Sequence, residues 1–267
     1  MLGQRIITAV GLVAVLALVL VVLPSDLAVL ALGALVLMGA WEWARLAGFA
    51  SVAARAAYTA SCAAAMAGLW FVTAETADFE RVMTITMVGW IPLFAWIALA
   101  PAFRANGLAA VAGLWALAPT WIALARLYLQ EDHGRELVVF VVLLAWVADI
   151  GAYFAGRRFG RLRLAPVVSP NKTWEGVLGG LAAGFAFALA GTAWFGLPAT
   201  GFLSLCVAAV LVSVVGDLLE SMFKRQQGLK DSGSLLPGHG GMLDRIDSLT
   251  SSVPLLALGL GWLGMVT

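Results

Sequence analysis

The sequence has few charged side chains and almost no cysteine. Asp, Glu, Lys and Arg make up 12% of its 267 residues, whereas a soluble domain carries about 25%. Hydrophobic residues make up 62%, and a globule of this size has too little interior to hide so much apolar surface. The two cysteines lie within apolar runs and form neither a disulfide framework nor a cysteine metal site. A soluble fold is therefore excluded.

The few charges also nearly cancel. Sixteen Lys and Arg are balanced by fifteen Asp and Glu, which leaves a net charge of +1 at pH 7. A nucleic-acid-binding protein normally carries a clear basic excess. We therefore expect no nucleic-acid partner.

The sequence contains long apolar runs instead of charged residues. Runs such as 6–23 and 27–41 indicate spans of a hydrocarbon core about 30 Å thick. We expect an all-α fold, a polytopic membrane helix bundle in the inner (plasma) membrane of the cell, in contact with membrane lipids. Breaks at proline, glycine and charged residues predict about nine spans, which are 5–23, 27–45, 56–74, 82–100, 107–125, 137–155, 174–195, 201–222 and 252–266.

Lysine and arginine are distributed unequally over the predicted topology. With the N-terminus in the cytoplasm, thirteen lie in cytoplasmic segments and three, Arg81, Arg126 and Arg135, lie outside. This bias follows the positive-inside rule and predicts a cytoplasmic N-terminus. It also places two long polar loops, 156–173 and 223–251, in the cytoplasm.

Most of the polar residues lie in the second half of the chain. We therefore divide the sequence into an N-terminal bundle of about five spans, 1–136, and a C-terminal catalytic region with both polar loops, 137–267. The stretch 213–248 is the most charged part of this region. An active site formed there would face the cytoplasm.

The eighth predicted span carries a polar stripe. At helical spacing, its polar side chains fall within an arc of roughly 80–100°. They are Ser213, Asp217, Glu220, Ser221 and Lys224. An acid within a span is costly unless it meets a partner, water or a metal. A simple charge network at the membrane edge, with Glu220 and Lys224 as an ion pair, is the alternative.

The loop after this span combines glycines with charges of both signs. Its glycines allow backbone N–H groups to turn towards an anion. Its cations suit phosphate oxygens, and they are Lys224, Arg225, Lys230 and Arg245. Its acids are hard oxygen ligands for Mg²⁺, and they are Asp231, Asp244 and Asp247. This combination favours phosphoryl or nucleotidyl transfer.

Three further positions complete the polar set. His239 lies between glycines and either donates to a phosphate, takes part in acid–base chemistry or orders the turn. Asp149 lies near the end of the sixth span and is either a site residue or a buried partner of an arginine. Ser169 before Pro170 predicts a helix start, whose free N–H groups, together with Lys172, suit an anion.

Several of these segments resemble one enzyme family. Residues 221–225 (SMFKR), 230–233 (KDSG) and 236–247 (LPGHGGMLDRID) are similar to the signature of the phosphatidate cytidylyltransferases, or CDP-diacylglycerol synthases. Residues 148–157 (ADIGAYFAGR) and 169–176 (SPNKTWEG) also resemble motifs of that family. The resemblance covers roughly residues 145–250, and the first five spans match only in being apolar.

The resemblance implies a reaction and its participants. The phosphate of phosphatidic acid attacks the α-phosphorus of CTP, which gives CDP-diacylglycerol and pyrophosphate. Mg²⁺ is the implied cofactor, with room for a second cation, and a homodimer is compatible with the family. Asp217 and Asp244 are the first candidates to hold Mg²⁺, with Asp231 and Asp247 as secondary candidates.

The resemblance also distributes the other roles. The four loop cations would bind CTP and pyrophosphate oxygens, while Asp149 would orient a cation or complete the metal shell. The remaining substrate-binding candidates are Ser169, Asn171, Lys172, Thr173, Ser221, Gly240 and Gly241.

Two alternatives to this hypothesis stay open. One is another CTP-dependent membrane lipid enzyme, such as a polyprenol kinase or an archaeal-type lipid cytidylyltransferase. The other is an ion-coupled transporter, whose intramembrane acids would form an ion path.

Overall fold

The structure is a computed structural model that describes residues 11, 13–236, 238 and 240–266. The first predicted span, 5–23, lies only partly within this range. His239 lies outside it.

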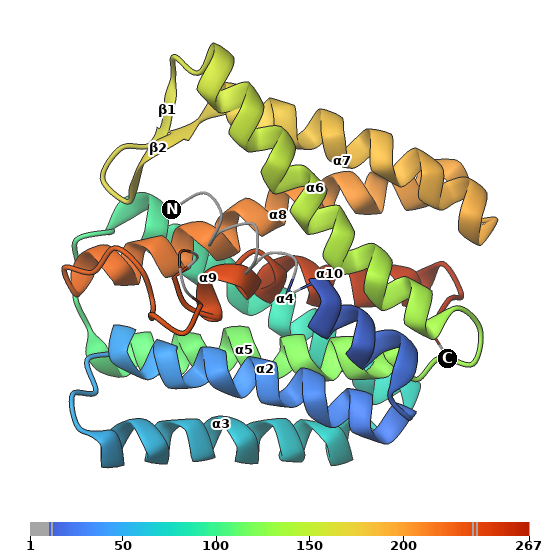
Figure 1. Ribbon diagram of the computed structural model, residues 1–267, viewed down its shortest axis with the longest axis horizontal. Coiled ribbons are helices and arrows are strands. Elements are labelled where there is room, and N and C mark those ends of the chain that lie inside the picture. The colour runs from blue at the N-terminus through green and yellow to red at the C-terminus, as the bar shows by residue number, and fades with distance from the viewer. Residues whose placement is uncertain (1–10, 12, 237, 239, 267) are drawn as a thin grey trace.

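The described chain is a bundle of helices with one small hairpin (Figure 1). A π-helical turn, η1 (Leu18–Val22), precedes the bundle. The first half contains α2 (Ser25–Leu46), α3 (Val52–Val72), α4 (Thr76–Leu99) and α5 (Asn106–Tyr128). The second half contains α6 (Gly134–Phe159), β1 (Arg163–Ala165), β2 (Ser169–Thr173), α7 (Trp174–Phe195), α8 (Ala199–Gln226), α9 (Leu243–Ile246) and α10 (Leu249–Trp262).

Within the described residues, six helices are long and apolar enough to cross a membrane, namely α2, α4, α5, α6, α7 and α8. The predicted all-α membrane bundle is confirmed at this level. The predicted number of nine spans is not confirmed, because α3 is long enough but less apolar and α10 has only 14 residues.

Helices α6 and α7 approach each other through small residues. A Cβ added to Gly151 on α6 would lie 2.5 Å from Ala183 Cβ and 2.7 Å from the Gly179 carbonyl oxygen on α7. A Cβ on Gly179 would lie 2.2 Å from Ala155 Cβ. Close backbone contact through small side chains is the usual way in which membrane helices associate. This contact leaves the ends of α6 and α7 side by side next to the hairpin.

Helices from the two halves of the chain pack directly against each other. Helix α10 contacts α8, α5 and α4, and α9 contacts α2. Gln226, at the end of α8, donates hydrogen bonds to the carbonyl oxygens of Pro101 (3.0 Å) and Phe103 (2.9 Å) between α4 and α5. Trp43 on α2 packs edge-on against Phe223 on α8. The first half thus supports the end of α8, and the division at residue 136 stays a prediction about function.

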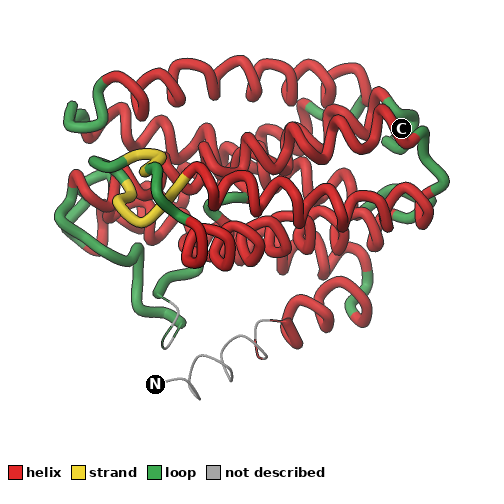
Figure 2. The backbone as a smooth tube through the Cα atoms, turned by 90° about the horizontal axis from the view of Figure 1, so that it is seen from above, coloured by secondary structure: helices red, strands yellow, loops and turns green. Residues whose placement is uncertain are grey.

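The hairpin corrects the predicted helix start at Ser169 and Pro170. Residues Ser169–Thr173 form strand β2, which pairs antiparallel with β1. Helix α7 begins only at Trp174, and the Thr173 hydroxyl caps it by accepting a hydrogen bond from Gly176 N at 3.1 Å. Pro170 lacks an N–H group and is tolerated in this two-stranded edge, while threonine is a preferred N-cap. Figure 2 shows the hairpin gathered with the loops at one end of the bundle.

Candidate active site

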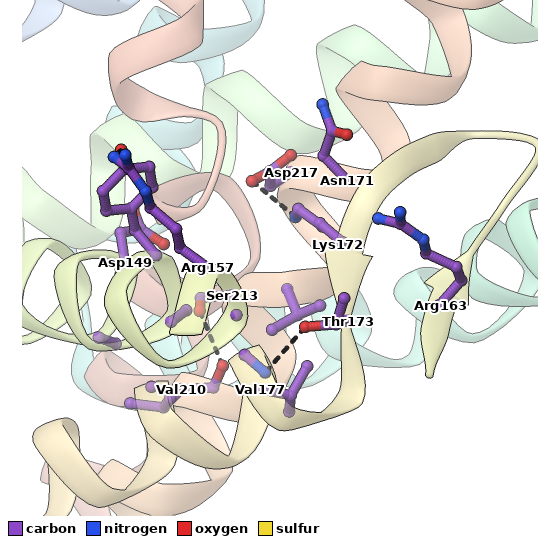
Figure 3. A pocket seen from close by; sticks show the side chains of 17 residues that line it. Asp149, Arg157, Arg163, Asn171, Lys172, Thr173, Val177, Val210, Ser213 and Asp217 are labelled. Carbon is purple, nitrogen blue, oxygen red and sulfur yellow. Dashed lines mark hydrogen bonds and ion pairs between the residues drawn. The ribbon is translucent and has the colours of Figure 1, made fainter. Parts of the chain in front are cut away.

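A cavity of about 600 Å³ opens at the hairpin end of the bundle, between α6, α7, α8 and β2. Its apolar wall includes small residues of α6 and α7 and valines of α8. Its polar lining contains Asp149, Tyr153, Arg157, Arg163, Asn171, Lys172, Thr173, Ser213 and Asp217. The sequence-predicted residues Asp149, Asn171, Lys172, Thr173 and Asp217 therefore meet in one cavity (Figure 3).

An ion pair between Asp217 and Lys172 joins α8 to the hairpin. The Nζ atom of Lys172 lies 2.6 Å from Asp217 Oδ2, and both side chains remain about one quarter exposed, at 26% and 27%. Ser221, one turn further along α8, donates a hydrogen bond to Asp217 Oδ1 at 3.2 Å. Figure 3 shows Lys172 pointing at Asp217 from the strand. The pair is accessible from the cavity, so a phosphate could compete for Lys172.

Behind this pair lies a group of acids. Asp247, between α9 and α10, interacts with the carboxylates of Asp217, Glu220 and Asp149. Burial and these three neighbouring carboxylates raise the pKa of Asp247 well above its ordinary value. Lys172, Lys224 and Arg245 interact with members of this group, so the acids belong to a network of both signs behind the cavity.

A second polar group surrounds Lys224. Its Nζ atom lies 2.6 Å from Glu220 Oε2 and 2.7 Å from Asp244 Oδ1. The Glu220 side chain is fully buried and Asp244 is 9% exposed. The ion pair between Glu220 and Lys224 that the sequence allowed is present. The proposed role of Lys224 as a phosphate ligand competes with its two carboxylate partners.

Asp244 holds the glycine-rich loop together. Its Oδ2 atom accepts hydrogen bonds from Gly241 N (2.7 Å), Ser232 Oγ (2.9 Å) and Ser232 N (3.1 Å). Burial opposes its charged form, but Lys224 and these donors lower the pKa of Asp244 below its ordinary value. Gly240 has a φ of +81°, and a Cβ there would lie 2.6 Å from Asp244 Oδ2. Only glycine suits this position.

The other predicted residues lie around these groups. Arg225 contacts the carbonyl oxygens of Val168 (3.4 Å) and Leu229 (3.5 Å), so it joins the end of α8 to the hairpin turn. Lys230 and Asp231 are exposed on the loop. Three further positions are placed as follows: Ser169 pairs with Ala165 outside the cavity, Arg245 lines a separate apolar cavity, and His239 lies outside the described residues.

Sequence reasoning missed three residues of this region. Arg157 and Arg163 line the cavity, and Arg157 donates a hydrogen bond to the Tyr153 hydroxyl at 2.9 Å. Arg157 closes the motif 148–157 without a predicted role, and Arg163 enters the sequence prediction only as one of the cytoplasmic basic residues. Glu42, on α2, contacts the glycine-rich loop. A lone acid at the end of an otherwise apolar run was the available signal for it.

The predicted acids are partly suited to bind a divalent cation. Among the described residues, no group of three or more His, Cys, Asp or Glu side chains is arranged to hold a metal ion. Mg²⁺, however, often uses one or two carboxylates together with substrate phosphates. Asp217 keeps about a quarter of its side chain exposed at the cavity and Asp247 lies among carboxylates, whereas Asp244 is only 9% exposed and is held by Lys224 and the loop donors. Of the predicted metal ligands, Asp217 and Asp247 are the better placed.

Comparisons with known sequences identify the family of this chain. A sequence model described as the cytidylyltransferase family matches residues 3–262. The chain belongs to the cytidylyltransferase family. It is 43% identical over 272 residues to a phosphatidate cytidylyltransferase of Pseudomonas aeruginosa, with 98% of this chain and 99% of that protein covered.

Other relatives in the same family carry the same name. A phosphatidate cytidylyltransferase of Haemophilus influenzae is 38% identical over 279 residues, which cover 95% of this chain and 96% of the relative. One from Brucella suis is 46% identical over 138 residues, about half of each chain (51% and 51%). The full-length matches include the first five spans, for which the motifs alone gave no resemblance.

Proposed function

We propose that this protein transfers the cytidylyl group of CTP to phosphatidic acid and so produces CDP-diacylglycerol and pyrophosphate for phospholipid synthesis. The similarity to full-length phosphatidate cytidylyltransferases supports this function. The observation that carries it is the cavity at one end of the bundle. It combines exposed cations, an acidic interior and an apolar wall, as a charged nucleotide and a lipid phosphate require.

The reaction needs charge neutralisation more than proton transfer. The attacking oxygen belongs to a phosphate that is already an anion, so no strong general base is required. The phosphate oxygen forms a bond to the α-phosphorus, and the bond to the bridging oxygen of pyrophosphate breaks. The protein must hold two polyanions in line and reduce their repulsion.

The cations that line the cavity suit this task. Lys172, Arg157 and Arg163 reach it from β2, α6 and β1. Lys172 is paired with Asp217 at 2.6 Å, and a substrate phosphate would replace part of that pairing. Lys230 is exposed on the loop and would reach the outer phosphates, with Arg225 and Arg245 as further candidates.

Mg²⁺ is the proposed cofactor, held by Asp217 and Asp247 with Asp149 close by. Asp231 and Asp244 remain in the candidate set, as does a second cation. When bound, the ion would neutralise charge that develops on the phosphate oxygens. Lys172, which faces Asp217 at the cavity, would supply a further positive charge beside the substrate phosphates.

We infer that the cavity faces the cytoplasm and that the protein lies in the inner membrane. The basic residues of the described chain gather at the cavity end of the helices, whereas Arg81, Arg126 and Arg135 lie at the opposite end. The positive-inside rule favours this orientation. With α3, α10 and the helix that ends in η1 as further spans, the chain would cross nine times and begin in the cytoplasm. A homodimer, and the absence of a nucleic-acid partner, stay predictions from the sequence.

Radiolabelled CTP tests this function. The purified protein in detergent is incubated with phosphatidic acid, Mg²⁺ and CTP labelled at either the α- or the γ-phosphate. Label from the α-position should appear in the lipid, and pyrophosphate should form in equal amount. Transfer of the γ-label would instead identify a lipid kinase. If neither label reaches the lipid, flux measurements in liposomes would test the transporter alternative.

A further inference from the structure

The side chain of one acid from the N-terminal half contacts the glycine-rich loop. Glu42 is on α2 and is only 5% exposed. Its Oε2 atom accepts a hydrogen bond from Leu243 N at 2.7 Å and from Ser232 Oγ at 3.0 Å. Both donors belong to the segment 232–243, about two hundred residues further along the chain. The carboxylate therefore joins the first spans to the loop that carries the motif.

The loop backbone closes tightly around this carboxylate. A Cβ added to Gly233 would lie 2.1 Å from Glu42 Oε1, and a Cβ added to Gly241 would lie 2.3 Å from Glu42 Oε2. A side-chain Cβ atom essentially never comes within 3.0 Å of a heavy atom of another residue. Two of the loop glycines are thus required by the space that Glu42 occupies.

Ser232 connects Glu42 to the acid that organises the loop. Its single hydroxyl proton is shared between Glu42 Oε2, 3.0 Å from the hydroxyl oxygen, and Asp244 Oδ2, 2.9 Å from it. Asp244 in turn pairs with Lys224 at 2.7 Å. A continuous polar chain therefore runs from α2 through the loop to α8. Through it, the position of α2 fixes the position of the loop.

A charge at this place needs a reason. Burying a carboxylate is costly unless hydrogen bonds or a cation compensate for it; among the described residues Glu42 forms no ion pair, although Arg55 interacts with it electrostatically. A hydrophobic side chain would hold α2 against α9 with less cost. A carboxylate can do what such a side chain cannot, which is to orient two specific donors of the loop.

We propose that Glu42 is a positioning residue of the transferase site, which holds the segment 231–244 in register with α8. It does not contact substrate, and this role rests on the function proposed above. By fixing Ser232 and the start of α9, it fixes Asp244 and, three residues later, Asp247. The first spans then contribute to catalysis indirectly, through the position of the loop.

Kinetics and hydrogen exchange of matched variants test the proposal. Glu42→Gln keeps the size of the side chain but presents an amide to two donors, and Ser232→Ala removes the link from the loop side. Each variant should lower kcat by about 10- to 100-fold, because small misplacements at a reacting centre have effects of that size. The KM for phosphatidic acid should change less than twofold, and amide exchange should rise only in peptides from 228–247.

The double variant provides the decisive comparison. If Glu42 acts through Ser232, Glu42→Gln with Ser232→Ala should be no slower than the slower single variant. Trp43→Phe is the structural control, because it removes a hydrogen bond from the neighbouring residue of α2 to the Ala109 carbonyl at 2.8 Å. It should lower the melting temperature without the selective loss of kcat.

The failures of the two proposals can be told apart. A wild-type protein that forms no CDP-diacylglycerol would reject the proposed function, and hydrogen exchange would then decide the role of Glu42. Unchanged exchange in 228–247, or single-variant effects on kcat that multiply in the double variant, would overturn the positioning role. If Glu42→Gln does not fold, Ser232→Ala alone must show both the loss of kcat and the local rise in exchange.

Discussion

Two polar regions share helix α8 and differ in how fully their charges are matched. In the cavity, Asp217 has one cation partner, Lys172, and both side chains keep about a quarter of their surface exposed. Around Lys224, two turns further on, Glu220 is fully buried and Asp244 is 9% exposed. The first region is open and the second is closed.

This difference indicates that the two regions have different roles. An exposed ion pair can exchange a partner for substrate or metal at little cost, since its net stabilisation is small. A buried network with two acids on one cation cannot lose a member without leaving an uncompensated charge. We therefore assign substrate chemistry mainly to the open region and the shape of the loop mainly to the closed one.

The largest expected effect is on catalysis in the open region. Asp217→Asn should lower kcat/KM by about 1,000-fold, because it removes a charge needed at the reacting phosphates. Pyrophosphate release from CTP and phosphatidic acid measures this loss. Asp26→Asn, at the exposed far end of α2, is the matched control and should retain full activity. A near-normal rate for a well-folded Asp217→Asn protein would contradict the assignment.

The closed region should respond first in stability. Lys224→Met leaves Glu220 and Asp244 buried without their cation, which should cost about 3–5 kcal/mol of folding free energy. Thermal unfolding in detergent measures the change. Adding Glu220→Gln to Lys224→Met should recover part of the stability, because one of the uncompensated charges is then absent. A Lys224→Met protein as stable as the wild type would show that the network is not closed.

A smaller effect is expected when the open pair loses its cation. Lys172→Ala should raise the KM of CTP or phosphatidic acid by about 10-fold and lower kcat less, because a single charge-assisted contact contributes about that much binding energy. Its stability should change little, in contrast to Lys224→Met. Initial rates over a range of each substrate provide the test. If the KM of both substrates stays unchanged, Lys172 does not belong to the site.

The smallest expected effect separates two acids of the same motif by pH. Asp244 has a lowered pKa, so its charge stabilises the fold above about pH 4 and this contribution is lost as the pH falls further. Asp247 has a raised pKa, so its ionisation destabilises the fold as the pH rises above about 4. At pH 7 without Mg²⁺, Asp247→Asn should therefore stabilise the protein and Asp244→Asn should destabilise it.

The melting temperatures of both variants between pH 5 and 8 check this contrast. Added Mg²⁺ should reduce the advantage of Asp247→Asn, because the ion favours the charged form of Asp247 in the wild type. Equal shifts in the same direction for both variants would show that the two acids have similar surroundings.

Much of this architecture could be predicted from local sequence. Apolar runs located the membrane helices, and α7 occupies the predicted 174–195. The stripe on α8 followed from helical spacing, and the ion pair of Lys224 with Glu220 lies along it. Proximity of Asp149, Lys172 and Asp217 was expected because the motifs lie at the same end of three neighbouring spans. These features depend on spacing within one element or on the resemblance.

Contacts between distant elements could not be predicted in the same way. The predicted helix start at Ser169 was wrong because this residue pairs with β1 in the hairpin. The local propensities of serine and proline do not reveal such a pairing partner. The role of Asp244 as an anchor depends on Ser232 and Gly241 folding back onto it. Glu42 was missed because its donors lie in another half of the chain.

The long separation between Glu42 and its donors has a consequence for biogenesis. Helix α2 enters the membrane when little of the chain has been made, since synthesis proceeds from the N-terminus, yet Leu243 lies 201 residues later. Until then the carboxylate must stay hydrated or protonated, because no loop is present to satisfy it. The active loop and the early helices therefore reach their final packing in one late event. A chain that stops before Ser232 would leave the Glu42 carboxylate without either of these donors, and this unpaired acid would distinguish an incompletely assembled protein.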